Sequence, residues 1–325
     1  MKIGVTGANG FVGTHLIKKL ETEGHDVTAL VRDKGTIAVP TDASVVEIPT
    51  LDGQVEITTL SEQLRGLDAL IHLAGHVHKM SADGRETAFH DVNVLGSARL
   101  FEAANDAGIS RFVFLSSVKA AGERSGAAPL TLENSPGPED AYGRSKRDAE
   151  QKLQALAVDA NCHLTILRAT FVYGWPAVGN FKSVINAVQK GVPLPLNSIQ
   201  NRRHMVYVGN LVDALWRAST SNTLSSTPYF VADDEPVSTP DLFRQTGNAF
   251  GTPAKLFPMP VWILRLAGAL TGRRNVIARL TENLEVDTRP FRRDADWMAP
   301  YNMSEGLMMC ADNHAQSMRD GKRQT

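Results

Sequence analysis

The sequence predicts an α/β protein with a doubly wound parallel sheet and a smaller C-terminal region. Three observations indicate this class. Short apolar runs alternate with longer stretches in which apolar residues recur every three or four positions, which is the pattern of βαβ units. A glycine-rich turn joins the first apolar run to the first helical stretch. After residue 168 the rhythm changes, and Gly174-Trp175-Pro176 opens a region of different composition.

The expected strands are short and apolar, and amphipathic helices separate several of them. Strands are expected at Lys2–Thr6, Asp26–Val31, Val45–Ile48, Ala69–Leu73, Arg111–Leu115 and Leu164–Arg168. Helices are expected at Thr14–Glu23, Asp91–Ala107, Tyr142–Val158 and near Phe181–Gln189. A later strand at Pro228–Ala232 precedes Ser238, whose hydroxyl can cap a helix with Pro240 in its first turn. The C-terminal half is therefore expected to fold as well.

The composition favours an enzyme that acts on small molecules. The chain has 325 residues, 42% of them hydrophobic, and a formal net charge of -1 without a basic stripe, so we expect no nucleic-acid partner. Cys162 and Cys310 lie far apart, which excludes a disulfide framework and a zinc site and favours the reducing cytoplasm. The apolar run at residues 3–5 is too short for the core of a signal peptide, so we expect none here.

The most apolar later stretch is Val261–Leu270, which is interrupted by Arg265. It falls well short of the roughly 20 residues that a membrane span requires. We therefore expect no stable membrane insertion and interpret the stretch as a buried helix. Contact with a membrane surface is the alternative.

The turn after the first strand has the glycine spacing of a dinucleotide-binding loop. Gly7 permits a tight turn, Gly10 lets the backbone approach a pyrophosphate, and Gly13 allows helix and sheet to pack closely. The position of the turn, at the first junction of strand and helix, is the stronger part of the signal. The expected cofactor contacts in this loop are Gly7, Asn9, Gly10, Phe11, Val12 and Gly13.

The loop makes the first domain Rossmann-type. We expect a dinucleotide-binding domain over residues 1–168, to which the chain returns around 204–232. Residues 169–203 and 233–312 are expected to form the substrate-binding region, and 313–325 a flexible tail.

The end of the second strand bears on the choice of cofactor. A carboxylate there would bind the ribose 2′-hydroxyl of NAD, whereas a cation would bind the 2′-phosphate of NADP. The chain has Val31 at the position expected for the acid, and Arg32 follows it, which favours NADP(H) over NAD(H). The alternative is that Arg32 is a solvated surface charge and that Asp33 binds the ribose.

Tyr142 and Lys146 lie four residues apart, on one face of an expected helix. A nearby ammonium stabilises a phenolate, so the tyrosine can exchange a proton with an alcohol or a carbonyl. A third group stands where Phe112-Val113-Phe114-Leu115 runs into Ser116 and Ser117, at the carboxyl end of a strand where ligands of parallel sheets bind. We expect Ser117 to hydrogen-bond the reacting oxygen and Ser116 to contact backbone or cofactor; a strand-end cap is the alternative.

These motifs, in this order, resemble the extended short-chain dehydrogenases/reductases, specifically the nucleotide-sugar epimerase/dehydratase group. Residues 68–75 and 93–97 are similar to the group's fourth strand and its following helix. The resemblance implies that cofactor contacts are made by Leu73, Ala74, Gly75, Tyr142, Lys146, Phe171 and Val172. A proline follows Arg168 in the group's pattern, whereas this chain has Ala169.

The substrate half is similar to the same group in Gly179-Asn180-Phe181 and in residues 201–208. The resemblance implies that Asn180 and Arg203 contact the diphosphate of a nucleotide sugar and that Phe181 belongs to the same substrate site. A guanidinium suits this task because its forked donors can bind two phosphate oxygens. The alternative is that Arg202 and Arg203 form an ordinary solvated pair.

Residues 116–123, 193–196 and 285–287 and Trp297 resemble one branch, the bacterial reductases of UDP-2-acetamido-2,6-dideoxy-4-hexulose. This implies NADPH-dependent reduction of a 4-keto UDP-sugar, with Tyr142 as proton donor, Lys146 on the ribose and Ser117 orienting the oxygen, in a homodimer. The first alternative is a UDP-hexose 4-epimerase with tightly bound NAD. A non-catalytic NADP(H) sensor and a reductase of non-nucleotide carbonyls are further alternatives.

Overall fold

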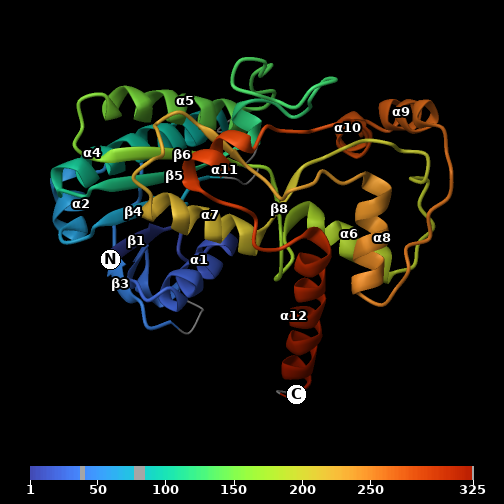
Figure 1. Cartoon of the computed structure of the whole chain (residues 1–325), viewed down its shortest axis with the longest axis horizontal. Helices are drawn as coiled ribbons and strands as arrows, with labels where there is room; N and C mark the ends of the chain where they lie inside the picture. Colours follow the sequence, from blue (N-terminus) through green and yellow to red (C-terminus); the bar gives the residue numbers. More distant parts are fainter. Residues whose placement is uncertain (37–40, 77–84, 324–325) are drawn as a thin grey trace.

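The computed structural model describes residues 1–36, 41–76 and 85–323 and is built around one parallel sheet (Figure 1). In the described residues this sheet has seven strands in the order β3-β2-β1-β4-β5-β6-β9. Their bounds are β1 Lys2–Thr6, β2 Asp26–Val31, β3 Ser44–Glu47, β4 Ala69–His72, β5 Arg111–Ser117, β6 His163–Ala169 and β9 Tyr229–Val231. The predicted fold class is confirmed.

Helices cover both faces of the sheet and give it two hydrophobic cores. Helices α1 (Phe11–Thr22) and α7 (Val208–Thr220) cover one face, against strand residues such as Val5 and Val113. Helices α2 (Ile57–Leu64), α4 (Ser97–Asp106) and α5 (Ala141–Ala157) cover the other, against residues such as Leu70 and Phe112 (Figure 1). Because both faces are buried, the middle residues of the strands are mostly apolar, as is typical of parallel sheets.

The strand order places a crevice at the carboxyl ends of β1 and β4. From β1 the chain builds outward to β2 and β3, and then returns to the other side of β1 through β4. The connecting helices leave in opposite directions at such a point, so the strand ends between them are open to a ligand.

The second region lies beside the carboxyl ends of the strands, on the right of Figure 1. A pair of short parallel strands, β7 (Phe171–Tyr173) and β8 (Met205–Tyr207), leads into it. Its helices are α6 Gly179–Gln189, α8 Thr239–Ala249, α9 Val261–Leu270, α10 Arg274–Thr281 and α12 Met303–Arg323. The chain returns to the sheet through α7 and β9, and α11 (Arg289–Ala295) packs there through the buried Phe291.

Two segments differ from the sequence-based expectation. The region expected as a flexible tail from residue 313 continues α12, which is helical to Arg323. The ring of His314 packs on those of Trp175 and Phe250, with centroids 4.7 and 5.6 Å apart, and these contacts hold the helix against the second region.

The second difference concerns α9, which is not the buried helix that its composition predicts. Leu264 and Gly268 are its buried residues, whereas Trp262, Leu266 and Leu270 are exposed. Composition alone does not separate a covered apolar face from an uncovered one. Among the described residues, no helix is both long and apolar enough to cross a membrane.

Candidate active site

The glycine loop has the geometry that close backbone packing requires. Gly7 has a φ of 69°, and a Cβ at this position would lie 2.8 Å from the amide nitrogen of Ala74. A Cβ on Gly13 would lie 2.2 Å from the carbonyl oxygen of Gly7. The loop therefore passes close to the end of β4, and α1 begins directly against the loop.

The N-terminus of α1 is suited to an anion. Gly10 is its N-cap and provides no side-chain hydrogen bond, so the amides of the first turn, which includes Phe11 and Val12, keep donor capacity. These donors and the positive end of the helix dipole bind phosphate. The chain therefore fits the diphosphate of a dinucleotide at this place, next to the exposed Asn9.

The residues at the end of β4 form the other side of the candidate dinucleotide site. A Cβ on Gly75 would lie 3.2 Å from Asn93 Oδ1 and 3.5 Å from Lys146 Nζ, so glycine lets both side chains approach the strand end. Ala74 N donates to the hydroxyl of Thr6, and Leu73 N donates to the Thr6 carbonyl, both at 3.3 Å. These bonds fix the β4 turn against β1.

Asn93 is a site residue that the sequence analysis missed. It lies in a π-helical turn, His90–Gly96, and is buried. Its Oδ1 accepts from His76 N at 2.7 Å, and its Nδ2 donates to Ser145 Oγ at 3.0 Å. Ser145 Oγ in turn donates to the carbonyl of Tyr142 at 2.8 Å. The π turn, a feature often found at functional sites, directs Asn93 toward His76 and Ser145. No residue pattern predicted this role for Asn93.

The structure brings Ser117, Tyr142 and Lys146 together at the carboxyl end of β5. Ser117 is the last residue of this strand, and its side chain interacts with the hydroxyl of Tyr142, which lies in the first turn of α5. Lys146 Nζ donates to the carbonyl of Leu115 at 2.9 Å and lies 4.4 Å from the ring centroid of Phe114. The three groups converge where a ligand of a parallel sheet would bind.

Burial shifts both titrating groups of this set. It raises the pKa of Tyr142 to about 12, with a further rise from Asp140, while the hydrogen bond with Ser117 acts in the opposite direction. Burial also lowers the pKa of Lys146 to about 8, although the charge of Glu150 opposes this shift. At neutral pH the phenol is therefore protonated, and the ammonium is still largely charged.

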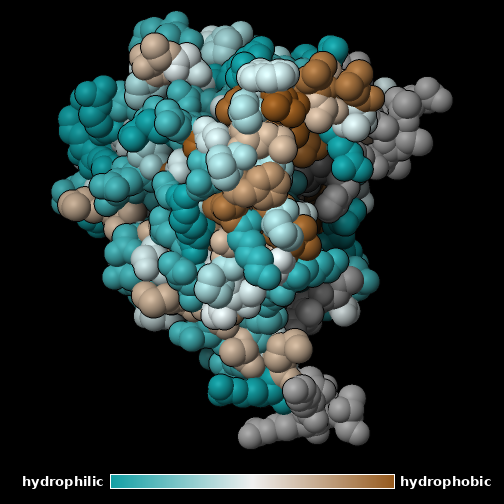
Figure 2. All heavy atoms as spheres, turned by 90° about the vertical axis from the view of Figure 1, so that its right-hand side faces the viewer, coloured by the Kyte–Doolittle hydropathy of each residue, from teal (hydrophilic) through white to brown (hydrophobic). Residues whose placement is uncertain are grey.

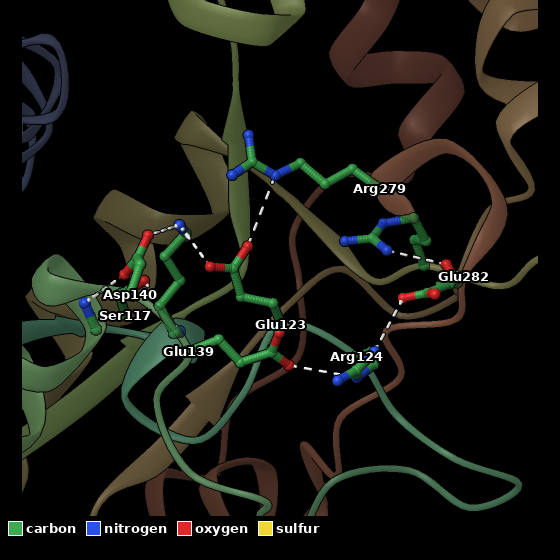
Figure 3. Close-up of polar contacts among 10 residues, drawn as sticks. Ser117, Glu123, Arg124, Glu139, Asp140, Arg279 and Glu282 are labelled. Carbon is green, nitrogen blue, oxygen red and sulfur yellow. Dashed lines mark hydrogen bonds and ion pairs between the residues drawn. The ribbon is translucent and has the colours of Figure 1, made fainter. Parts of the chain in front are cut away.

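An ionic network links Ser117 to the helix that carries Tyr142 (Figure 3). Lys119 donates to Asp140 and, at 2.9 Å, to Glu123. The same Asp140 caps α5 by accepting from the amide of Gly143 at 2.7 Å. The amide of Lys119 donates to Ser117 Oγ at 3.3 Å. The network thereby fixes the first turn of α5 relative to Ser117.

On the substrate side, the two neighbouring arginines differ. Arg202 is exposed and pairs with Glu285 at 3.0 Å. Arg203 is half-buried, and its Nη1 donates to the carbonyl of Glu282 at 2.9 Å. Burial and the charge of Arg279 lower the pKa of Arg203 to about 10. Arg203 is thus not part of a solvated pair with Arg202. Its guanidinium lies near that of Arg279 and near the carboxylates of Glu123 and Glu282.

Arg279 of α10 is a second residue that the sequence analysis missed. It pairs with Glu123 of the network at 3.6 Å, although the two residues lie far apart in the sequence. No motif signalled it, because its place beside the site comes from the packing of α10.

The remaining predicted positions are distributed as follows. Asn180 is exposed in the first turn of α6, but the Phe181 ring is 1% exposed and packs on Tyr173 with ring centroids 5.5 Å apart. The predicted substrate contact of Phe181 is therefore wrong for its side chain, because the ring fills the core. Phe171 and Val172 are the first two residues of β7. They are half-buried and pack against the hydrophobic core beneath α1 and α7.

Arg32 is exposed and directly follows β2. The side chain of Val31 is 5% exposed and belongs to the core, so it faces away from any cofactor. Asp33 Oδ1 accepts from the amide of Gly35 at 2.8 Å. Arg32 is therefore an exposed cation directly at this strand end, and the exposed Lys34 follows two residues later.

Comparisons with known proteins agree with this geometry. A model of the NAD dependent epimerase/dehydratase family matches residues 3–231. The UDP-glucose 4-epimerase of Vibrio cholerae is 34% identical over 317 residues, which cover 96% of this chain and 95% of that protein. The UDP-2-acetamido-2,6-beta-L-arabino-hexul-4-ose reductase of Pseudomonas aeruginosa is 25% identical over 251 residues, 75% of this chain and 56% of that protein.

The solved structure of the UDP-glucose 4-epimerase of Thermotoga maritima with UDP-glucose has the same fold, with a TM-score of 0.76 at 20% identity over 98% of this chain and 100% of that one. The family model spans the sheet from β1 to β9, and the Vibrio relative matches nearly the whole chain. The predicted resemblance is thus confirmed: the chain belongs to the NAD-dependent epimerase/dehydratase family and is an NAD(P)-dependent enzyme of the extended short-chain dehydrogenase/reductase type.

Proposed function

We propose that this chain reduces the 4-keto group of a UDP-linked sugar with NADPH. The observation that carries the proposal is the placement of the Tyr142 hydroxyl beside Ser117, with Lys146 one helical turn away, at the end of β5. A proton donor next to a hydrogen-bond donor is what a carbonyl oxygen needs when its carbon receives a hydride. The bound nicotinamide supplies that hydride.

The cofactor would be held by groups on both sides of the crevice. The amides at the start of α1 would bind its diphosphate, Lys146 would bind the nicotinamide ribose, and the exposed Arg32 would bind the 2′-phosphate that distinguishes NADP from NAD. Because Gly7 and Gly75 have no Cβ, the glycine loop lies close to Ala74, and Asn93 and Lys146 lie close to the end of β4.

The chain's own part in the reaction is to hold and move one proton. Ser117 orients the carbonyl oxygen, and Tyr142 gives its hydroxyl proton to that oxygen. The carbonyl thus becomes an alcohol. Lys146 stabilises the phenolate that remains, since its ammonium lies one helical turn away. Reprotonation from solvent returns Tyr142 to its starting state.

The substrate would be anchored through its diphosphate. Arg203 and Arg279 would supply the positive charge, with Asn180 as a polar contact from α6. Because like charge from Arg279 lowers the pKa of Arg203, an anion between them would relieve repulsion as well as form hydrogen bonds.

The test is a stoichiometric assay. Purified protein is mixed with a UDP-linked 4-keto sugar and NADPH; we expect one NADPH oxidised for each 4-hydroxy product identified by NMR. Tyr142→Phe should lower turnover about 10²- to 10⁴-fold, the usual effect of losing a general acid, with cofactor affinity retained. Tyr301→Phe, in a tyrosine that packs on Tyr207 outside this set, is the matched control and should leave turnover unchanged. Near-normal turnover of Tyr142→Phe would remove this residue from the mechanism.

A UDP-hexose 4-epimerase with tightly bound NAD is the second candidate. It is favoured by the 34% identity to a protein named UDP-glucose 4-epimerase. Interconversion of two UDP-hexoses without added cofactor, and no oxidation of NADPH by the keto sugar, would support this activity instead.

The family resemblance also leads us to propose a cytoplasmic homodimer. Light scattering after size-exclusion chromatography would measure its mass; a monomer at micromolar concentration would contradict this part of the proposal.

A further inference from the structure

Helix α9 has an apolar face that the rest of the fold does not cover. Trp262, Leu266 and Leu270 follow one another every four residues and are 66%, 53% and 79% exposed. Leu264 and Gly268 lie two residues further along each time, on the opposite side of the helix, and are buried. The helix is thus apolar on two sides, but the protein packs against only one of them.

The exposed stripe is part of a larger hydrophobic patch. Val276 of the neighbouring α10 is 51% exposed, and Phe257, ahead of α9, is 39% exposed. Figure 2 shows hydrophobic surface gathered in the upper part of the side of the molecule that carries α9 and α10 in Figure 1. Large exposed apolar patches of this kind mark interaction sites.

The segment that carries the patch also has an excess of basic residues, although Arg244 pairs with Asp241 and Arg279 with Glu123. Between Leu242 and Thr281 the sequence has six Lys and Arg and no Asp or Glu, although the whole chain has 34 basic and 35 acidic residues. Arg265, Arg273 and Arg274 are exposed on α9, after it and at the start of α10. The partner of this surface must therefore be both apolar and negatively charged.

We propose that α9 and α10 dock the protein onto an anionic phospholipid surface. A helix of ten residues, about 15 Å long, lies in the plane of the interface rather than crossing it. Trp262 and the leucines of the stripe enter the boundary between headgroups and acyl chains, and the arginines meet the lipid phosphates. A second copy of this chain fits less well, because a twofold contact through this patch would place cations against cations.

Vesicle flotation tests the proposal at two lipid compositions. We expect the protein to float with vesicles of phosphatidylglycerol and phosphatidylcholine at low salt, and much less with phosphatidylcholine alone. Trp262→Ser/Leu270→Ser should weaken binding about tenfold or more, because most of the inserted apolar surface is lost. Val158→Ser, in an equally exposed valine that follows α5, is the matched control and should bind as the unmodified protein does.

The charge contribution is tested separately. Arg273→Gln/Arg274→Gln should weaken binding to the anionic vesicles about fivefold for each charge removed. The same change in two exposed cations of the first domain, Arg65→Gln/Lys152→Gln, should have little effect. Equal losses in the two pairs would mean that attraction is nonspecific and would overturn the docking geometry.

Tryptophan fluorescence locates the contact. Trp262 is the exposed one of the four tryptophans, so insertion should shift the emission to the blue, and Trp262→Phe should abolish the shift while the protein still floats. Failure to float with anionic vesicles would overturn the proposal. So would flotation unaffected by Trp262→Ser/Leu270→Ser. A dimer that this double variant dissociates, in a protein that does not float, would assign the patch to a second copy instead.

Discussion

The ion pair between Glu150 and Arg168 is expected to be the most sensitive electrostatic contact behind the active site. Arg168 of β6 donates to Glu150 of α5 through Nε at 3.0 Å and Nη2 at 2.6 Å, and both side chains are almost fully buried. Ser116 Oγ donates to the same carboxylate at 2.5 Å. Glu150 also lies one helical turn from Lys146 and opposes the lowering of the lysine pKa.

Glu150→Gln removes the charge with little change in volume and leaves the guanidinium of Arg168 buried without a counter-ion. Breaking a buried pair in this way costs about 3–5 kcal/mol. With an unfolding entropy of ~2.1 cal/mol/K per residue, a chain of 325 residues should lose about 4–7 °C in Tm. Glu150→Leu/Arg168→Met, which removes both charges, should lose much less.

The assay is reversible urea unfolding followed by circular dichroism, with calorimetry for Tm. Arg244→Gln is the control, since its pair with Asp241 is about half exposed and contributes about 0–1 kcal/mol. A loss below about 1 kcal/mol for Glu150→Gln, or a double variant as unstable as the single one, would refute the reasoning that an uncompensated buried charge dominates.

Three further predictions concern ligand binding and pH. Arg203→Ala should weaken UDP binding in calorimetry about 10- to 100-fold, because a charge-assisted hydrogen bond is lost. Arg202→Ala, in the exposed neighbour, should change UDP binding little. Equal effects of the two variants would refute the different roles of these arginines. Arg32→Ala should raise the NADPH dissociation constant in fluorescence titration about 10- to 100-fold and leave that of NADH nearly unchanged, so equal weakening of both would contradict the NADP preference. Burial lowers the pKa of His72 to about 3, so in this pH range the unfolded state binds a proton that the folded state does not. The free energy of unfolding should therefore fall by about 1.4 kcal/mol per pH unit as the pH drops from about 6.5 toward 3. The same pH dependence in His72→Asn would contradict this prediction.

The central sheet was predictable from sequence because its strands are buried on both faces. β1 and β2 have the predicted bounds, and Lys2–Thr6 and Asp26–Val31 are short, mostly apolar runs flanked by turn residues. The glycine loop was predictable for a related reason, since Gly7 and Gly13 occupy places where a Cβ cannot fit. Local steric limits and burial restrict which residue types can occupy a position, so their effects can be predicted from the sequence.

Contacts that depend on how helices and turns pack together could not be predicted from the residue types. Asn93 reaches Ser145 through a π turn, and Arg279 reaches Glu123 because α10 packs beside the site. Phe181 illustrates the opposite error: it adjoins the polar Asn180 in a recognisable motif, yet its ring is buried. Residues that are adjacent in a motif need not face the same way, because side chains of successive helical residues point about 100° apart around the helix axis.

The pKa of Tyr142 bears on the direction in which the reaction starts. An epimerase begins by removing a proton from the sugar hydroxyl, so its tyrosine must first be a phenolate. Burial raises the pKa of Tyr142 to about 12, so the phenol is the form that this chain holds without cofactor. A reductase begins by donating the proton, which the buried phenol already carries. Epimerisation would therefore need an added positive charge beside Tyr142, such as that of an oxidised nicotinamide ring, whereas keto reduction can start from the charge state that this chain adopts by itself. Together with Arg32 at the end of β2, this favours reduction as the first step.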